Sequence, residues 1–284
     1  MEFAEYTMKR KKTHQKQNSR RKHARTLQTG LIMLGILILL AVFAPVICRY
    51  DPLEQNLADF LQPPGKAHWF GTDQLGRDLF ARVLYAARTD LTIMFLAEIA
   101  PFAIGVFLGM LAGYYGGFAD WLIGLAADTF IAFPFYLLVI VIAFATGAGT
   151  HGIFITYLLV GWLIYCKVAR GQTASLKTSE WIFAARIMGY SDLRILLTQL
   201  LPNILPQAVV LLMTDMVGLL VIIVTLGYLG IGIAPPAPDW GTMISEGQSL
   251  MTTAWWLSVI PGIFVVYTGI ALSFIGDGLA DRWR

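Results

Sequence analysis

Charged residues are scarce in this chain of 284 residues, since Asp, Glu, Lys and Arg make up 14% of it and hydrophobic residues 57%. Soluble globular domains carry about 25% charged residues. The apolar residues here gather in long stretches, and about 20 of them in a helix cross a bilayer core of about 30 Å. The composition therefore excludes an ordinary soluble domain and predicts an integral membrane protein.

Residue types that support catalysis or metal binding are also few. The 2 cysteines and 4 histidines do not have the spacing of a zinc site. The sequence contains no Gly-x-x-x-x-Gly-Lys-Ser/Thr phosphate-binding loop, no His-Glu-x-x-His and no Gly-x-Ser-x-Gly. We expect no catalytic residue, metal site or cofactor in this chain, and we expect Cys48 and Cys166 to be free thiols.

Six apolar stretches are long enough to span a bilayer, which predicts an all-α membrane protein with six transmembrane helices. The stretches lie at about 27–47, 91–113, 121–146, 152–168, 205–230 and 256–275. Gly105, Gly109 and Gly113 repeat every four residues in the second stretch, which predicts close helix packing. The first follows a long basic segment and lacks the small-x-small cleavage site of a signal peptide. We therefore expect it to be retained as a transmembrane helix.

The distribution of Lys and Arg predicts the orientation of these helices. Residues 1–26 are strongly basic, which predicts a cytoplasmic tail rather than a nucleic-acid-binding segment. With six spans the C-terminus is cytoplasmic too. The basic segment between the fourth and fifth spans then lies inside, and residues 235–253, which have no Lys or Arg, lie outside. Residues 48–90 form a long external segment.

The segment 170–203 predicts a helix–turn–helix on the inner face of the membrane. Gly189 is suited to the left-handed end of a first short helix, and Ser191 is suited to cap the next one. Pro202 and Pro206 are expected to break this second helix where the fifth span begins. A compact element of this kind at a membrane surface is typical of a docking site for another subunit.

This segment resembles the "EAA" loop of importer permeases of the ATP-binding-cassette superfamily. The family pattern has Glu-Ala-Ala, then Gly four residues later, and a His-x-x-Pro-Asn ending; Phe183 replaces the Glu and Gln199 the His. The resemblance implies a coupling helix that seats in a groove of an ATP-hydrolysing subunit. The residues that match the pattern are Ala184, Ala185, Gly189, Pro202 and Asn203, and we expect the coupling loop to include Arg186, Ser191 and Asp192 as well. The small side chains of Ala184 and Ala185 would let the partner approach closely.

A second motif narrows the resemblance to permeases for dipeptides, oligopeptides and nickel, and to the C-type member of each permease pair. It is the Gly-Thr-Asp-x-x-Gly-Arg-Asp signature, formed here by Gly71, Thr72, Asp73, Gly76, Arg77 and Asp78. The Pro-rich stretch from Pro235 to Gly241 and the segment Gly276–Asp281 also match that family. From the residues alone, the signature could form a structural ion-pair plug, contact a solute-binding protein, or contact the solute.

Three acidic residues fall inside the predicted spans: Glu98, Asp128 and Asp215. Acids there cost about 2.5–3.5 kcal/mol each at the helix centre, so they face the bundle interior, a partner or a watery path. We expect Asp128, which precedes Phe133-Pro134, to be structural. Asp215 is a candidate for lining the pathway, where it would suit a cationic solute group, and helix packing is the alternative.

The resemblance implies a transmembrane permease subunit of an ATP-driven, binding-protein-dependent importer of di- and oligopeptides in the bacterial inner membrane. The alternatives are an importer of nickel or metal chelates, and a stand-alone secondary transporter. The implied partners are a second permease in a heterodimer, two ATP-binding subunits that hold ATP and Mg, an extracytoplasmic solute-binding protein and the lipid bilayer, without nucleic acid. The implied organisation is a tail (1–26), a first transmembrane helix (27–47), an external segment (48–90) and a five-helix permease core (91–284).

Overall fold

The computed structural model describes residues 25–147 and 149–283. Almost all of the predicted basic tail, residues 1–24, lies outside the described residues. Within the described part, regular structure is helical, and the only β-type pairing is an isolated bridge between Thr72 and Asp78. The prediction of an all-α protein is therefore confirmed for these residues.

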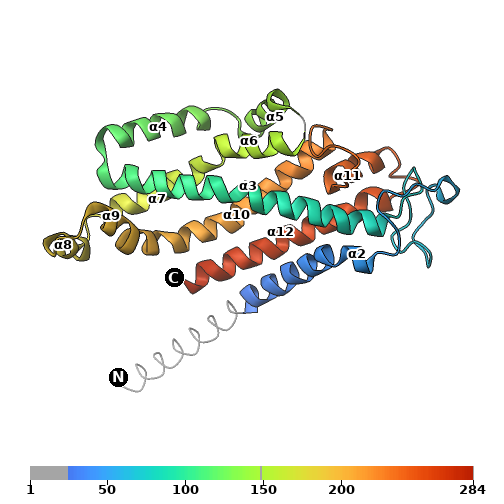
Figure 1. The fold of residues 1–284 in the computed structure, drawn as a ribbon, viewed down its shortest axis with the longest axis horizontal. Coiled ribbons are helices and arrows are strands. Elements are labelled where there is room, and N and C mark those ends of the chain that lie inside the picture. Colours follow the sequence, from blue (N-terminus) through green and yellow to red (C-terminus); the bar gives the residue numbers. More distant parts are fainter. Residues whose placement is uncertain (1–24, 148, 284) are drawn as a thin grey trace, which may run out of the picture.

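Most of the main helices run along the long axis of the molecule, whereas α5 lies across it (Figure 1). The main helices are the first helix (Arg25–Val42), α3 (Leu79–Tyr115), α4 (Gly117–Ile131), α5 (Phe135–Thr146), α6 (Thr150–Val160), α7 (Trp162–Leu176), α10 (Leu201–Tyr228) and α12 (Trp256–Arg282). Short elements connect them: α2 (Ala44–Ile47), a 3-10 turn (Leu57–Asp59), α8 (Glu180–Ile187), α9 (Asp192–Ile195), a π segment (Leu196–Leu200) and α11 (Trp240–Gln248).

Five of these helical units are long and apolar enough to cross a membrane: Arg25–Val42, Leu79–Tyr115, Thr150–Leu176, Asp192–Tyr228 and Trp256–Arg282. A sixth span is possible if α4 and α5 count as one. The span predicted at 121–146 is divided into two helices, because α4 and α5 meet at a bend of 88°. Pro134 lies at this break, and a proline disfavours helical geometry in the residue before it.

Several predicted boundaries also differ from the structure. Helix α3 begins at Leu79, so residues 79–90 of the predicted external segment are helical. The fourth span continues to Leu176, into the segment expected to be a loop. Pro202 and Pro206 do not end a helix, because helical structure is continuous from Asp192 to Tyr228. Pro202 directly follows the π segment, and such local π geometry lets a membrane helix tolerate a proline.

A stripe of glycines brings α3 and α7 into close contact. A Cβ atom on Gly109 would lie 2.9 Å from Ala169 Cβ, and one on Gly113 would lie 2.8 Å from Thr173 Cβ. Gly105 faces the Tyr165 side chain in the same way. The prediction that this four-residue repeat allows close helix packing is confirmed, since small residues at such spacing let two backbones approach.

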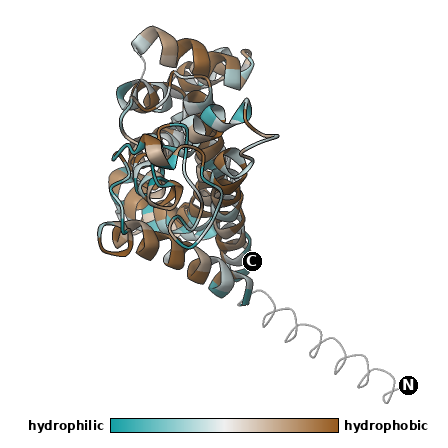
Figure 2. Ribbon diagram, turned by 90° about the vertical axis from the view of Figure 1, so that its right-hand side faces the viewer, coloured by the Kyte–Doolittle hydropathy of each residue, from teal (hydrophilic) through white to brown (hydrophobic). Residues whose placement is uncertain are grey.

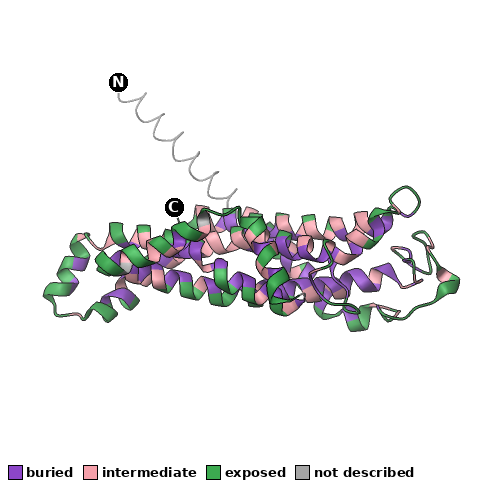
Figure 3. Ribbon diagram, turned by 90° about the horizontal axis from the view of Figure 1, so that it is seen from above, coloured by how far each residue is buried: buried purple, intermediate pink, exposed green. Residues whose placement is uncertain are grey.

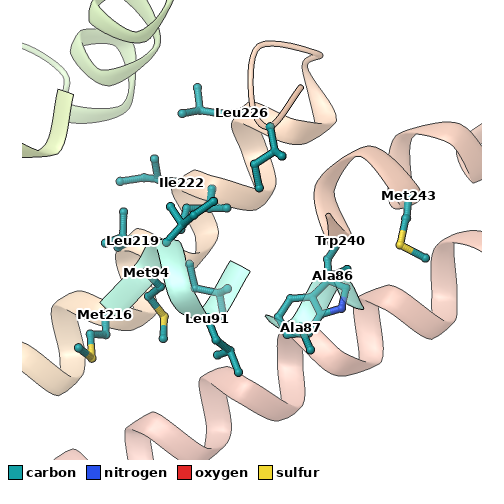
Figure 4. Packing of buried hydrophobic residues seen from close by; sticks show 14 of the residues in the cluster. Ala86, Ala87, Leu91, Met94, Met216, Leu219, Ile222, Leu226, Trp240 and Met243 are labelled. Carbon is teal, nitrogen blue, oxygen red and sulfur yellow. The ribbon is translucent and has the colours of Figure 1, made fainter. Parts of the chain in front are cut away.

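The buried side chains form two main clusters. The larger joins the first half of α3 to α10, α11, α12 and the first helix. In Figure 4, Leu91 and Met94 of α3 lie against α10 residues such as Leu219, and the indole of Trp240 lies over the small residue Ala87. The smaller cluster joins the second half of α3 to α7, α8 and the start of α10. Both ends of the bundle are therefore fixed to α3.

The two ends of the bundle differ in character. We call the end that carries α8 and α9 the α8 end, and the opposite end the α11 end (Figure 1). Hydrophilic residues gather in the loops of the α11 end, whereas the helices behind them are mostly hydrophobic (Figure 2). The α8 end is largely exposed (Figure 3).

Candidate functional site

The turn between α8 and α9 has the geometry that the sequence predicted. Gly189 has a φ of 80°, and its N–H bonds the Arg186 carbonyl at 2.9 Å while the Tyr190 N–H bonds the Ala185 carbonyl at 3.1 Å. These two bonds form a Schellman motif, which ends a helix on a left-handed glycine. Ser191 Oγ then accepts the Arg194 N–H at 3.4 Å, so Ser191 is the predicted N-cap of α9.

The outer face of α8 is apolar and open to solvent. Ile187 is 87% exposed and Met188 66%, and Phe183 and Leu193 are more than half exposed. Ala184 lies on the same exposed face, whereas Ala185 is buried in the cluster of Ile182 and α3 side chains. Apolar residues grouped on a terminal loop mark a protein interaction surface, and of the two predicted alanines only Ala184 faces it.

Side chains of α3 hold this loop to the bundle. Tyr114 Oη donates a 2.6 Å hydrogen bond to Asp192 Oδ1, and the Arg186 guanidinium lies 5.3 Å from the centre of the Tyr114 ring. Lys177 Nζ donates to the Tyr114 carbonyl at 3.3 Å. Asp192 and Arg186, both predicted loop residues, therefore contact a transmembrane helix. Pro202 and Asn203 are exposed, and the Asn203 side chain donates a hydrogen bond to the Gln199 carbonyl at 2.6 Å.

The Gly-Thr-Asp-x-x-Gly-Arg-Asp motif lies at the α11 end, and its side chains contact other residues of the same chain. Asp73 is 4% exposed and accepts from Arg77 Nε at 2.7 Å and from Arg82. It also accepts the N–H groups of Leu75 and Arg77. Burial alone would raise the pKa of Asp73, but the guanidinium groups of Arg82 and Arg77 and these N–H groups together lower it below its usual value.

The other residues of the motif have structural contacts as well. Asp78 caps α3 through the Ala81 N–H at 2.8 Å and lies 2.8 Å from His68 Nδ1. Thr72 is fully buried, and its carbonyl accepts the Trp256 indole N–H at 3.2 Å. Gly71 and Gly76 both have positive φ. The arrangement resembles the ion-pair plug that was one of three predicted roles, with Arg77 and Arg82 also reaching Glu246 of α11 at 3.4 and 3.2 Å.

Asp215 lies in the middle of α10 beside Glu98 of α3, and two tyrosines, Tyr157 and Tyr165, adjoin both acids. Tyr165 Oη donates to Glu98 Oε1 at 2.5 Å. Asp215 also lines a cavity of about 410 Å³ between α5, α6, α7 and α10. Asp128 is exposed on α4. The predicted pathway residue is thus the one intramembrane acid of the three that reaches this cavity.

Sequence reasoning missed several partners of these sites. The pairing of Glu98 with Asp215 joins residues that are 117 positions apart in the sequence. Glu246, Arg82 and His68 complete the ion-pair cluster from outside the motif. A signal was available for Glu98, because an acid inside a span needs a partner or a watery path. The sequence offered no signal for Tyr114.

Two family matches cover most of the chain. Residues 105–284 match the family described as binding-protein-dependent transport system inner membrane component. Residues 21–64 match the N-terminal TM domain of oligopeptide transport permease C. The chain belongs to this family of importer permeases.

Curated relatives agree with the family match. The dipeptide transport system permease protein DppC of Alkalihalophilus pseudofirmus is 36% identical over 252 residues, which are 89% of this chain and 83% of the relative. The oligopeptide transport system permease protein OppC of Bacillus subtilis is 35% identical over the same shares. The chain is therefore a multi-pass permease subunit of an ABC importer in the bacterial inner membrane, and the stand-alone transporter alternative is not favoured.

A solved structure shares the fold. A chain from inward facing conformations of the MetNI methionine ABC transporter aligns with a TM-score of 0.57 at 18% sequence identity, covering 72% of this chain and 96% of that one. At this identity the likeness concerns the fold alone. It agrees with the all-α importer permease that the sequence resemblance implied, in the type I ABC importer fold.

Proposed function

We propose that this permease imports di- and oligopeptides in a complex with a second, different permease, two ATP-binding subunits and an extracytoplasmic solute-binding protein. The exposed apolar face of α8 carries the proposal, because it is a docking surface without a partner in its own chain. ATP and Mg bind in the partner ATPase subunits. The relatives reported above are named for dipeptides and oligopeptides, which favours peptides over the nickel and metal-chelate alternative.

The α8 end faces the cytoplasm in this proposal. The described start of the first helix at Arg25 and the end of α12 both lie toward the α8 end (Figure 1). The basic residues in 1–26 belong on the cytoplasmic side by the positive-inside rule, so this end is cytoplasmic. The N- and C-termini are then both cytoplasmic. The α11 end, with the segment 48–78 and α11, faces the solute-binding protein.

Each predicted residue set has a role in this arrangement. Ala184 and Gly189 lie at the docking face, while Ala185, Arg186, Ser191 and Asp192 shape the loop and fasten it to α3. ATP binding moves the ATPase subunits, and α8 transmits this motion to α3 through Tyr114. A two-state element biased from both ends is what such coupling requires. The external motif holds the start of α3 and α11 together.

Reconstituted transport tests this function. The complete importer is placed in proteoliposomes with the binding protein outside and ATP inside, and the uptake of radiolabelled dipeptide, tripeptide and nickel is compared. We expect ATP-dependent accumulation of peptide and none of nickel. ATP-dependent accumulation of nickel without peptide would overturn the proposed substrate class, and uptake that is independent of ATP would overturn the importer mechanism.

A further inference from the structure

A cavity in the membrane-spanning part of the protein is lined by one acid among aromatic side chains. Its volume is about 410 Å³, within the range of small-molecule sites. One face of the α6–α7 helix, with Tyr157, Gly161, Ile164 and Lys167 at intervals of three and four residues, forms one wall. Phe133 and Phe135 at the break between α4 and α5 form a second wall, and Asp215 of α10 forms a third.

The acid in this wall is backed by a second, fully buried acid. Glu98 has no exposed surface and lies next to Asp215. Among the described residues, Glu98 Oε2 and Asp215 Oδ2 are buried atoms without a hydrogen-bond partner. Most buried polar atoms are hydrogen-bonded, so two neighbouring carboxyl oxygens left without donors call for an explanation.

Of the two acids, Asp215 is the one that lines the cavity, so it is the one that a ligand there can contact. An ionised carboxyl group accepts hydrogen bonds, and a carboxylate inside a membrane is costly unless a cation or water compensates it. An ammonium group carries three N–H donors and one positive charge on a compact atom. The ion pairs among the described residues do not include Asp215 or Lys167, the cation that lines the same cavity.

We propose that Asp215, supported by Glu98, binds the protonated amino terminus of the peptide as it passes through the cavity. This inference rests on the proposed function and adds a specificity-determining contact inside the membrane. The aromatic walls accept side chains of varied shape, while the acid fixes the end of the chain that all unmodified peptides share. Tyr157 lines the cavity beside Asp215, and Lys167 lies ten residues further along the helix, about 15 Å away at 1.5 Å per residue. A cation placed there keeps the amine at the Asp215 end.

Equilibrium binding to the complex without its binding protein tests the contact directly. The permease pair with its ATPase subunits is held in nanodiscs, and radiolabelled Ala-Ala and N-acetyl-Ala-Ala are compared by scintillation proximity. We expect wild type to bind Ala-Ala about tenfold more tightly or better, which corresponds to about 1.4 kcal/mol. Asp215→Asn keeps the shape of the side chain, and we expect it to bind both peptides equally and weakly.

Two further variants separate a specific contact from a general defect. Asp128→Asn removes an exposed acid of α4 that does not line the cavity, and we expect it to keep the tenfold preference. Glu98→Gln is expected to reduce the preference severalfold, because it removes the carboxyl group that supports Asp215. If Asp215→Asn keeps the preference for the free amine, or if wild type shows none, the proposal is wrong.

The same preparation distinguishes this failure from a failure of the proposed function. ATP-driven uptake of Ala-Ala by the complete importer is measured in parallel. Uptake without a preference for the free amine in the binding assay rejects the Asp215 contact and leaves peptide import standing. Absence of peptide uptake by wild type rejects peptide import itself, and the inference fails with it.

Discussion

Tyr114 at the end of α3 donates a 2.6 Å hydrogen bond to Asp192 at the start of α9. This bond joins the α8 end of the protein to the helix that runs its full length. Tyr114 is buried, and its ring also lies against the Arg186 guanidinium. One side chain therefore contacts both α8 and α9, and we expect movement of these helices to be transmitted through it to the end of α3.

Tyr114→Phe tests whether this contact couples ATP hydrolysis to transport. The substitution keeps the buried ring and removes the hydroxyl that bonds Asp192. We expect the peptides transported per ATP hydrolysed to fall about fivefold, the effect of about 1 kcal/mol of coupling free energy, while ATPase subunits still co-purify. The control is Tyr115→Phe, since Tyr115 is 58% exposed. Unchanged stoichiometry in Tyr114→Phe would contradict the coupling role.

The contact between α3 and α7 tolerates no side chain at Gly109. We expect Gly109→Ala to destabilise the protein by about 1–3 kcal/mol, because the new methyl group overlaps Ala169 and the Cys166 carbonyl. Gly171→Ala is the matched control on α7, where a Cβ would meet nothing within 4 Å. This change is expected to be neutral or stabilising, since Ala favours a helix over Gly. Thermal unfolding in detergent compares the two variants. Equal melting temperatures would show that the close approach of α3 and α7 does not contribute to stability.

Removal of the Asp73 carboxylate leaves two guanidinium groups short of a partner. Arg82 is 3% exposed and keeps only Glu246 at 3.2 Å as an acidic contact. Breaking one side of a buried ion pair costs about 3–5 kcal/mol, so we expect Asp73→Asn to lower the melting temperature strongly. Glu54→Gln, which neutralises an exposed acid of the same segment, should leave it unchanged. A small effect of Asp73→Asn would mean that the motif is not a structural plug.

The acid that caps α11 predicts a pH dependence of stability. Burial, with a smaller effect of the Glu246 carboxylate, raises the pKa of Asp239 to about 6, although the Thr242 and Gly241 N–H groups and Arg82 oppose the shift. The folded protein then holds a proton that the unfolded chain releases near pH 3.8. The contribution of this group to stability is therefore present below pH 3.8 and declines as the pH rises to about 6.

Asp239→Asn removes this titration and keeps a good N-cap. Unfolding free energies of wild type and variant are compared from pH 4 to pH 7 in urea. We expect the variant to gain on wild type as the pH rises, by on the order of 3 kcal/mol in total. Glu246, Arg82 and the adjacent Asp90 remain in both proteins. A constant difference across this range would contradict the assignment.

Local signals in the sequence predicted local features of the fold well. Gly189 and Ser191 were sufficient to place the end of α8 and the cap of α9, because both depend on neighbouring backbone groups. The repeat of Gly105, Gly109 and Gly113 predicted a close helix contact but not α7 as the partner. Apolar length predicted the spans, yet it did not reveal that α3 begins at Leu79.

Features that depend on distant residues were not predictable in the same way. The burial of Ala185 follows from its packing against α3, and the pairing of Glu98 with Asp215 joins two helices far apart in sequence. Pro202 and Pro206 were expected to end a helix, but the π segment and the first turn of α10 accommodate them. Pro134, in contrast, produces the bend between α4 and α5 that hydropathy alone could not show.

Docking of ATPase subunits on α8 is the central claim, and affinity purification of the tagged permease in mild detergent tests it most directly. Wild type is compared with Ile187→Glu, which places a charge on the exposed face of α8, and with Leu57→Glu, the same change at a residue 70% exposed at the α11 end. We expect wild type and Leu57→Glu to carry a second permease and the ATPase subunits, and Ile187→Glu to lose the ATPase subunits alone. If Ile187→Glu retains them at wild-type levels, or if wild type remains alone after crosslinking in the membrane, the account is contradicted.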